Sequence, residues 1–432
     1  MIYLKRWLKN NCLGLKGILL AITIYLITLP LAKLGYNNLA LGILILSLFI
    51  NRKYITFNRN KALYLPIIFY LFLVLSLFWT INSKESTKAL SKEITLFIVP
   101  IVFLFIPKFS KADVRRVLKN FSYAMSIYST GILINAAYRY VKTKNIDVFF
   151  YHELVTLNVN AIYISAISSI GLLFLIHNNL KKWWDYLAAI ILAITIILLS
   201  SKNIIVITIL LSTLSFIVFK KKQKHAYTLL AITILILAAF SSKILSRFQT
   251  EANAFNEEII FSNGIKNVSI TEALYQDQFS NNNYFSGTSL RIYQARLLSE
   301  FIQEDHIFWT GYGINASQNK IKDKQIERGY VDYFGTLNFH NQYLQNFAEI
   351  GFIGFLLFIV IILNSIYVAI KNKDFNFLCY ALLIGSLCIT ESILARQRGV
   401  ALFIIFYCIY HHQNKKEHTT WYVPFFIFTM LR

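Results

Sequence analysis

The chain has 432 residues, of which 56% are hydrophobic and only 15% are charged. A soluble globular protein carries roughly 25% charged residues, so this composition excludes an ordinary soluble domain and indicates surface that faces lipid. The net charge of +22 would suit a nucleic-acid-binding protein. Most of that charge lies in short loops between apolar segments, however, and we therefore expect no nucleic acid among the partners.

About twelve apolar segments follow one another along the chain, and several approach the ~20 residues that a membrane-spanning helix needs. In chain order they are Ile18–Ala32, Tyr36–Ile50, Ala62–Ile81, Ile94–Ile106, Phe121–Tyr138, Leu154–Ile176, Tyr186–Ser201, Asn203–Phe219, Ala226–Ser242, Ile350–Ile370, Phe375–Thr390 and Gly399–Tyr410. They predict an all-α polytopic membrane protein of about 12 transmembrane helices. The final stretch, Trp421–Leu431, is too short to span and is interpreted as interfacial.

Lysine and arginine are unevenly distributed between alternate loops. With the N-terminus in the cytosol, most of them fall on the cytosolic side, in the loops Arg52–Lys61, Lys108–Lys119, Lys181–Lys182, Lys220–Lys224 and Lys371–Lys373. The opposite loops hold fewer. This positive-inside bias predicts a multi-pass protein with both termini in the cytosol.

The long polar stretch after Ser242 predicts a separate loop domain on the outer side. It contains an amphipathic helix, Ser289–Gln303, for which Ser289 is a suitable N-cap. Loops of this length usually form lids or binding segments, and a flexible spacer is the alternative. We therefore expect three parts: residues 1–242 with helices 1–9, residues 243–349 as the loop domain with short helices, and residues 350–432 with helices 10–12 and a cytosolic or interfacial tail.

The pair His340-Asn341, directly before an apolar segment, is the strongest candidate for chemistry. An imidazole titrates near ~6.5, so it accepts a proton at neutral pH with little tuning. Asn341 can hydrogen-bond a ligand hydroxyl. The alternative is that the pair only caps the following helix, in which Gly351 and Gly354 would let another backbone approach closely.

Several cations on the outer side form the second candidate element. Arg291 lies at the start of the amphipathic helix, where the helix dipole adds to its guanidinium and suits a phosphate or pyrophosphate. Lys202 sits in a tight turn between two apolar segments, Arg247 closes the ninth segment, and Arg396 flanks the last outer turn. Interfacial snorkelling explains any one of them. Together they could hold an anionic headgroup.

Other site types lack sequence support. No nucleotide-binding loop, dinucleotide fingerprint or zinc spacing is present, so we expect neither a cofactor nor a metal. The near-absence of charged residues inside the apolar segments argues against an ion-coupled carrier.

Six motifs share one family resemblance. They are Leu75–Thr80, Ser286–Arg291, Gly311–Gly313, His340–Leu344, Gly351–Gly354 and Glu391–Gly399. In this order they resemble the O-antigen ligase and O-antigen polymerase superfamily of bacterial membrane glycosyltransferases, over roughly Leu63 to Tyr410. The resemblance implies metal-independent transfer of a glycan from an undecaprenyl-pyrophosphate donor at the periplasmic face of the inner membrane. It places the 243–349 loop domain in the periplasm.

The resemblance also implies roles for single residues. His340 would be the general base for the acceptor hydroxyl, and Arg291 would bind the donor pyrophosphate. Lys202 stands where the family usually has an arginine, and a lysine offers a point charge without the bidentate fork. Arg247, Asn341, Tyr343 and Arg396 are expected to contact substrate, Tyr343 as an aromatic platform for a sugar.

The first hypothesis is an O-antigen ligase, which joins polymerised glycan to a lipid A–core acceptor. An O-antigen or exopolysaccharide polymerase, which extends lipid-linked repeats, uses the same donor and differs only in its acceptor. A transporter of lipid-linked sugars is a third possibility, but it would need charged residues along a central cavity. The expected partners are the lipid-linked donor, a lipid A–core or lipid-linked glycan acceptor, and membrane lipids.

Overall fold

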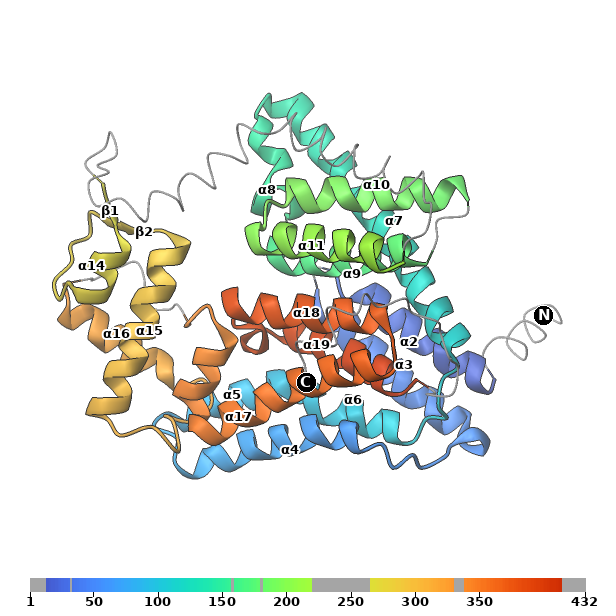
Figure 1. The fold of residues 1–432 in the computed structure, drawn as a ribbon, viewed down its shortest axis with the longest axis horizontal. Helices are drawn as coiled ribbons and strands as arrows, with labels where there is room; N and C mark the ends of the chain where they lie inside the picture. Colours follow the sequence, from blue (N-terminus) through green and yellow to red (C-terminus); the bar gives the residue numbers. More distant parts are fainter. Residues whose placement is uncertain are drawn as a thin grey trace.

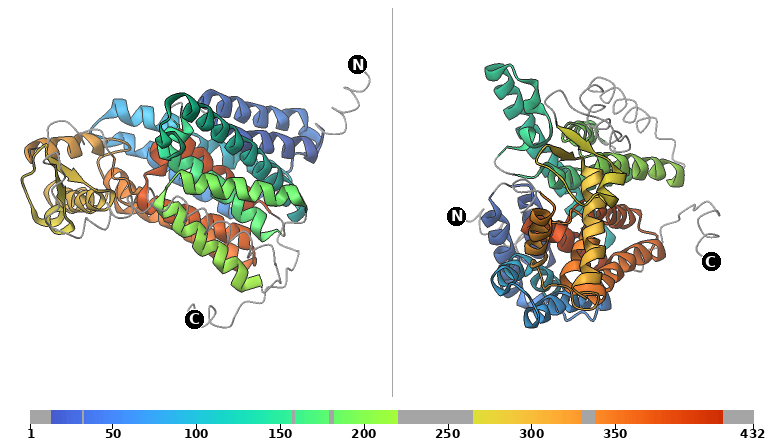
Figure 2. Two further views of the ribbon diagram at one scale, coloured as in Figure 1. Left: turned by 90° about the horizontal axis from the view of Figure 1, so that it is seen from above. Right: turned by 90° about the vertical axis from the view of Figure 1, so that its left-hand side faces the viewer.

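The computed structural model describes residues 13–31, 33–156, 159–178, 182–219, 265–329 and 338–413. Within these ranges the chain forms a bundle of apolar helices with a smaller subdomain at one end (Figures 1 and 2). This subdomain, residues 265–329, is called the loop subdomain below. The predicted all-α class is confirmed, since the strands described are only β1 (Lys266–Val268) and β2 (Asn283–Phe285), paired in parallel.

Every predicted apolar segment that falls in the described ranges overlaps a helix, whereas Ala226–Ser242 lies outside them. The bundle helices are α2 (Leu15–Thr28), α3 (Leu34–Ile50), α4 (Lys61–Leu75), α5 (Ser83–Glu93), α6 (Thr95–Leu104), α7 (Lys111–Thr143), α8 (Tyr151–Val155), α9 (Ala161–His177), α10 (Trp183–Leu198), α11 (Lys202–Phe219), α17 (Gln342–Lys371), α18 (Phe375–Thr390) and α19 (Gln397–His411). Short 3₁₀ turns are η1 (Arg52–Tyr54), η2 (Ser76–Phe78), η3 (Ile146–Phe149) and η5 (Ile393–Ala395). Asn60, Ser110, Asn160 and Asp374 start four of the helices, because each side chain accepts a hydrogen bond from the first turn.

Two helical stretches are long and apolar enough to cross a membrane, namely Lys61–Phe78 and Gln342–Lys371. Other apolar helices, including α2, α9, α10 and α18, have 10–17 residues. Twelve spans therefore remain a prediction.

Large apolar side chains cover much of the outside of the bundle. Phe49 is 71% exposed, Ile127 73%, Ile134 65% and Leu363 57%. This apolar exposure occurs on several bundle helices, among them α3, α7 and α17. It suits contact with hydrocarbon, which is the environment that the composition predicts.

The loop subdomain has its own hydrophobic core. Helices α14 (Ile270–Tyr275), α15 (Gly287–Glu304) and α16 (Ser317–Glu327) surround the rings of Phe279, Phe285 and Tyr293, whose centroids lie 5.2–5.5 Å apart. The predicted amphipathic helix corresponds to α15. Its expected N-cap was wrong: the helix begins at Gly287, because the Ser286 hydroxyl accepts the hydrogen bond from the Ser289 backbone N–H at 3.2 Å.

A kink in α17 joins the loop subdomain to the bundle. Ile350 and Gly351 have non-helical backbone angles, which divide α17 into a short outer part before them and a long part after them. The segment 307–314 lies against this kink. Its backbone hydrogen bonds are Tyr312 N to Ala348 O (2.9 Å), Gly313 N to Glu349 O (2.7 Å) and Phe352 N to Phe308 O (2.8 Å). Close backbone approach at Gly351 agrees with the expectation from sequence.

Candidate functional site

His340 lies at the entrance to α17, where the chain turns into the helix. Asn341 is the N-cap, since its side-chain oxygen accepts from the backbone N–H groups of Tyr343 (2.9 Å) and Leu344 (3.1 Å). His340 itself has φ 45°, a conformation that is uncommon outside glycine and is often found at functional sites. Its side chain is 28% exposed, and Nδ1 lies 3.9 Å from Glu391 Oε2. The imidazole therefore faces a carboxylate and remains reachable from outside.

Arg291 connects three parts of the site. It sits just after the first turn of α15, which Ser286 caps. Its guanidinium donates to the backbone carbonyls of Gly287 (2.7 Å), Thr390 (2.8 Å) and His340 (3.4 Å). A guanidinium has five N–H donors, so these three bonds leave two for a ligand. Arg291 holds the histidine loop against the end of α18 and still offers part of its fork.

The turn that carries Lys202 reaches the same place from another direction. Lys202 is half-buried and begins α11. Its neighbour Asn203 donates to Ser386 O (2.7 Å) and to Thr390 Oγ1 (2.8 Å), and Ser386 Oγ donates back to Asn203 Oδ1 (2.6 Å). Thr390 is thus shared by Asn203 and Arg291. His340, Arg291 and the Lys202 turn all meet at the C-terminal end of α18.

The other residues that were predicted to contact substrate lie in different surroundings. The Tyr343 hydroxyl donates to Gly385 O at 2.9 Å, and its ring packs on Phe358, so this side chain is used in the interface between α17 and α18. Arg396 is exposed beside η5. Arg247 lies outside the described residues. Among the described residues, no group of three or more His, Cys, Asp or Glu could hold a metal ion.

Three residues at this site were not among the predicted functional residues. Asn203 and Thr390 supply the hydrogen bonds that bring α11 and α18 together, and Glu391 supplies the charge that faces His340. Glu391 was part of a quoted motif and Asn203 follows Lys202 directly, so sequence proximity was the available signal. No sequence signal pointed to Thr390, because it resembles any other threonine at the end of an apolar segment.

A comparison with known protein families matches the part of the chain that contains most of this site. Residues 187–359 match the family model described as O-antigen ligase, which confirms the predicted resemblance to the O-antigen ligase and polymerase superfamily and supports a membrane location. The matched range contains Lys202, Arg291 and His340 but ends before Thr390 and Glu391. No curated protein matches the chain.

Proposed function

Because residues 187–359 match the O-antigen ligase family, we propose that this protein is an O-antigen ligase. It transfers glycan from an undecaprenyl-pyrophosphate donor to a lipid A–core acceptor at the periplasmic face of the bacterial inner membrane. The observation that supports this proposal is the meeting of His340, Arg291 and the Lys202 turn at the end of α18. It brings His340, the Arg291 guanidinium and the turn that carries Lys202 together from three separate parts of the chain.

In the proposed reaction His340 takes the proton from the acceptor hydroxyl. The oxygen of that hydroxyl forms the new bond to the anomeric carbon of the donor glycan as the bond from that carbon to the phosphate oxygen breaks. The imidazolium that results lies near Glu391, whose carboxylate is 3.9 Å from Nδ1 and so stabilises the charged ring. General base catalysis of this kind contributes roughly 10²–10⁴-fold to a rate.

The leaving group is the lipid pyrophosphate, which takes the electron pair of the broken bond. Negative charge develops on its oxygens, so cations already in position stabilise the transition state more than the ground state. Arg291 contributes the two N–H groups that it does not spend on backbone carbonyls, and Lys202 contributes a point charge. The carbonyl bonds of Arg291 keep the guanidinium from having to reorganise during the reaction.

The site is proposed to face the periplasm, as the positive-inside bias predicts. A reporter enzyme that is active only outside the cytosol should be active when it is fused into an exposed turn of the loop subdomain. A signal from the cytosolic side would refute the orientation.

The decisive experiment is glycan analysis of a deletion strain complemented with variants. Loss of long chains from lipid A, with lipid-linked polymer retained, indicates a ligase. Glycan of a single repeat would instead indicate the polymerase. His340→Ala should fail to restore transfer although the protein accumulates, whereas the control His306→Ala, at an exposed histidine of the loop subdomain, should restore it. Full activity of His340→Ala would refute the proposed base.

A further inference from the structure

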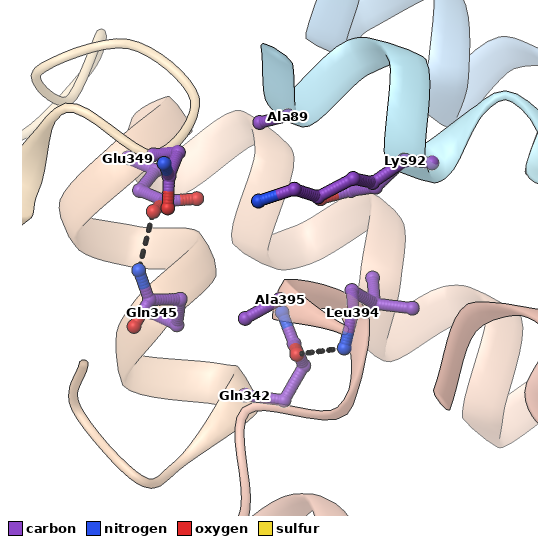
Figure 3. A pocket seen from close by; sticks show the side chains of 9 residues that line it. Ala89, Lys92, Gln342, Gln345, Glu349, Leu394 and Ala395 are labelled. Carbon is purple, nitrogen blue, oxygen red and sulfur yellow. Dashed lines mark hydrogen bonds between the residues drawn. The ribbon is translucent and has the colours of Figure 1, made fainter. Parts of the chain in front are cut away.

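A small polar pocket lies beside the site, between α5, η5 and the first two turns of α17 (Figure 3). Its polar lining consists of Lys92, Glu93, Asn315, Gln342, Gln345 and Glu349. The volume is about 10 Å³, which is close to the minimum that holds one water molecule. The pocket therefore accepts one small group rather than a whole sugar ring.

Most polar groups of this pocket already have partners. Gln342 Oε1 accepts from Leu394 N (2.7 Å), and Gln342 Nε2 donates to Asn346 Oδ1 (2.7 Å). Gln345 donates to Glu349, which also accepts from the backbone of Asn315. These bonds hold the wall in one arrangement.

The carboxyl group of Glu93 has no such partner among the described residues. Glu93 is 6% exposed and lines the pocket, yet no hydrogen bond reaches its carboxylate from the residues that the structure describes. A buried carboxylate without donors is costly. Burial and the nearby Glu349 carboxylate raise the pKa of Glu93 well above its ordinary value. The group thus lacks a hydrogen-bond donor on the pocket side.

Lys92 limits which chemical groups of a ligand the pocket can bind. Its exposed side chain reaches across the pocket (Figure 3), and within the described ranges it forms no ion pair with Glu93 or Glu349. A hydroxyl group can donate to a carboxylate and accept from an ammonium at the same time. A ligand ammonium would be repelled by Lys92, and a ligand carboxylate is too large for a pocket of about 10 Å³. A hydroxyl is the group that fits both.

The position of the pocket favours binding of the acceptor over binding of the donor. Gln342 lies two residues after His340, and Ser392, which follows Glu391, donates to Gln345 Oε1 at 3.4 Å. The pocket is therefore lined by the same two segments, 340–349 and 391–395, that carry the proposed base and the carboxylate facing it. The Lys202 turn lies with α11 on one side of α18, whereas α5 lies on the other side (Figures 1 and 2). The donor pyrophosphate and this pocket would thus be separated by the end of α18.

We propose that this pocket binds one hydroxyl group of the acceptor saccharide, with Glu93 accepting its hydrogen bond and Lys92 donating to its oxygen. The contact holds the acceptor beside His340 and contributes to acceptor selection. This inference rests on the proposed glycan transfer.

The test measures KM for each substrate with purified protein in nanodiscs, using the native lipid-linked donor and lipid A–core from the deletion strain. Glu93→Gln should raise KM for the acceptor roughly 3- to 10-fold, because the amide replaces one of the two oxygens with an NH₂ group that cannot accept a hydrogen bond, and should leave KM for the donor unchanged. It should leave Tm nearly unchanged, because glutamine has nearly the same shape and is also polar and buried. A purely structural role for Glu93 would instead lower Tm.

Two further variants complete the test. Ala395→Leu fills the pocket from η5 without changing its charges and should also raise KM for the acceptor. Glu85→Gln, on the same helix but in an exposed pair with Lys88, should change neither KM. Unchanged acceptor KM in Glu93→Gln and Ala395→Leu, or a rise in donor KM alone, would overturn the inference. Absence of transfer by the unaltered protein would instead overturn the proposed function.

Discussion

Gly351 should tolerate no side chain, and replacing it with alanine is expected to detach the loop subdomain from α17. The residue has φ +67° and ψ −170°, a region that is essentially restricted to glycine. A Cβ atom added there would lie 2.2 Å from the carbonyl oxygen of Trp309 and 2.6 Å from Thr310 N. Those atoms are backbone, so they cannot rotate away.

The size of the effect follows from these contacts. The backbone conformation alone would cost alanine about 1–3 kcal/mol. Moving the 307–314 segment away would break its three backbone hydrogen bonds to α17, each worth about 1 kcal/mol. We therefore expect a local loss of about 4–6 kcal/mol, which corresponds to roughly 10³–10⁴-fold in the opening equilibrium.

Hydrogen–deuterium exchange with mass spectrometry measures this opening directly. Peptides that contain Tyr312 and Gly313 should exchange much faster in Gly351→Ala, while peptides from α9 should not change. Gly131→Ala is the matched control, because Gly131 is an exposed helical glycine whose added Cβ would meet nothing within 4 Å. Exchange of the 307–314 segment within tenfold of the unaltered protein would show that the kink is not locked by this contact.

Three further outcomes are expected. Arg291→Lys should reduce transfer nearly as much as Arg291→Ala, by about a hundredfold or more. Both variants lose the guanidinium that donates to three carbonyls. Near-normal turnover of Arg291→Lys would show that only the positive charge matters. Glu391→Gln should slow transfer about tenfold without changing accumulation, and an unaltered rate would exclude a role for that carboxylate. Burial raises the pKa of Asp305, but hydrogen bonds from Tyr312 and Lys320 outweigh this effect and lower the pKa from its ordinary value of 3.8. The carboxylate therefore stabilises the folded state above pH 3.8. This stabilisation is lost as the pH falls through the pKa that Asp305 has in the folded protein. Acid unfolding of the loop subdomain, followed by exchange, should be less steep in Asp305→Asn.

Hydropathy and helix-capping chemistry predicted the helices well, because both are local properties of the chain. Apolar runs such as Phe375–Thr390 became helices, and Asn341 became a cap as its alternative interpretation required. The Ser286 cap was missed because Gly287 and Thr288 look like a turn. A glycine is nevertheless acceptable in the first turn of a helix whose N-cap side chain is satisfied.

Long-range contacts could not be predicted in the same way. Arg291 was expected to bind an anion, but its carbonyl bonds to Thr390 and His340 depend on how α15 and α18 pack. Glu93 and Glu349 lie on segments far apart in the sequence, and neither stands in a pattern that indicates chemistry. Only the approach of α5 to α17 makes them neighbours.

The outer part of α17 links the proposed base to the proposed acceptor pocket. Gln342, Gln345 and Glu349 are spaced so that they share one face of the helix, and His340 lies immediately before its start. The loop subdomain holds this short helix at both ends, through the bond from Arg291 to His340 O and the bond from Gly313 to Glu349 O. Any tilt of the helix must therefore move the imidazole together with the wall of the pocket that α17 supplies, whereas Lys92 and Glu93 belong to α5. An acceptor hydroxyl bound by Lys92 and Glu93 would therefore be aligned with the proposed base while the start of α17 packs against α5, and such alignment is what transfer to a single hydroxyl requires.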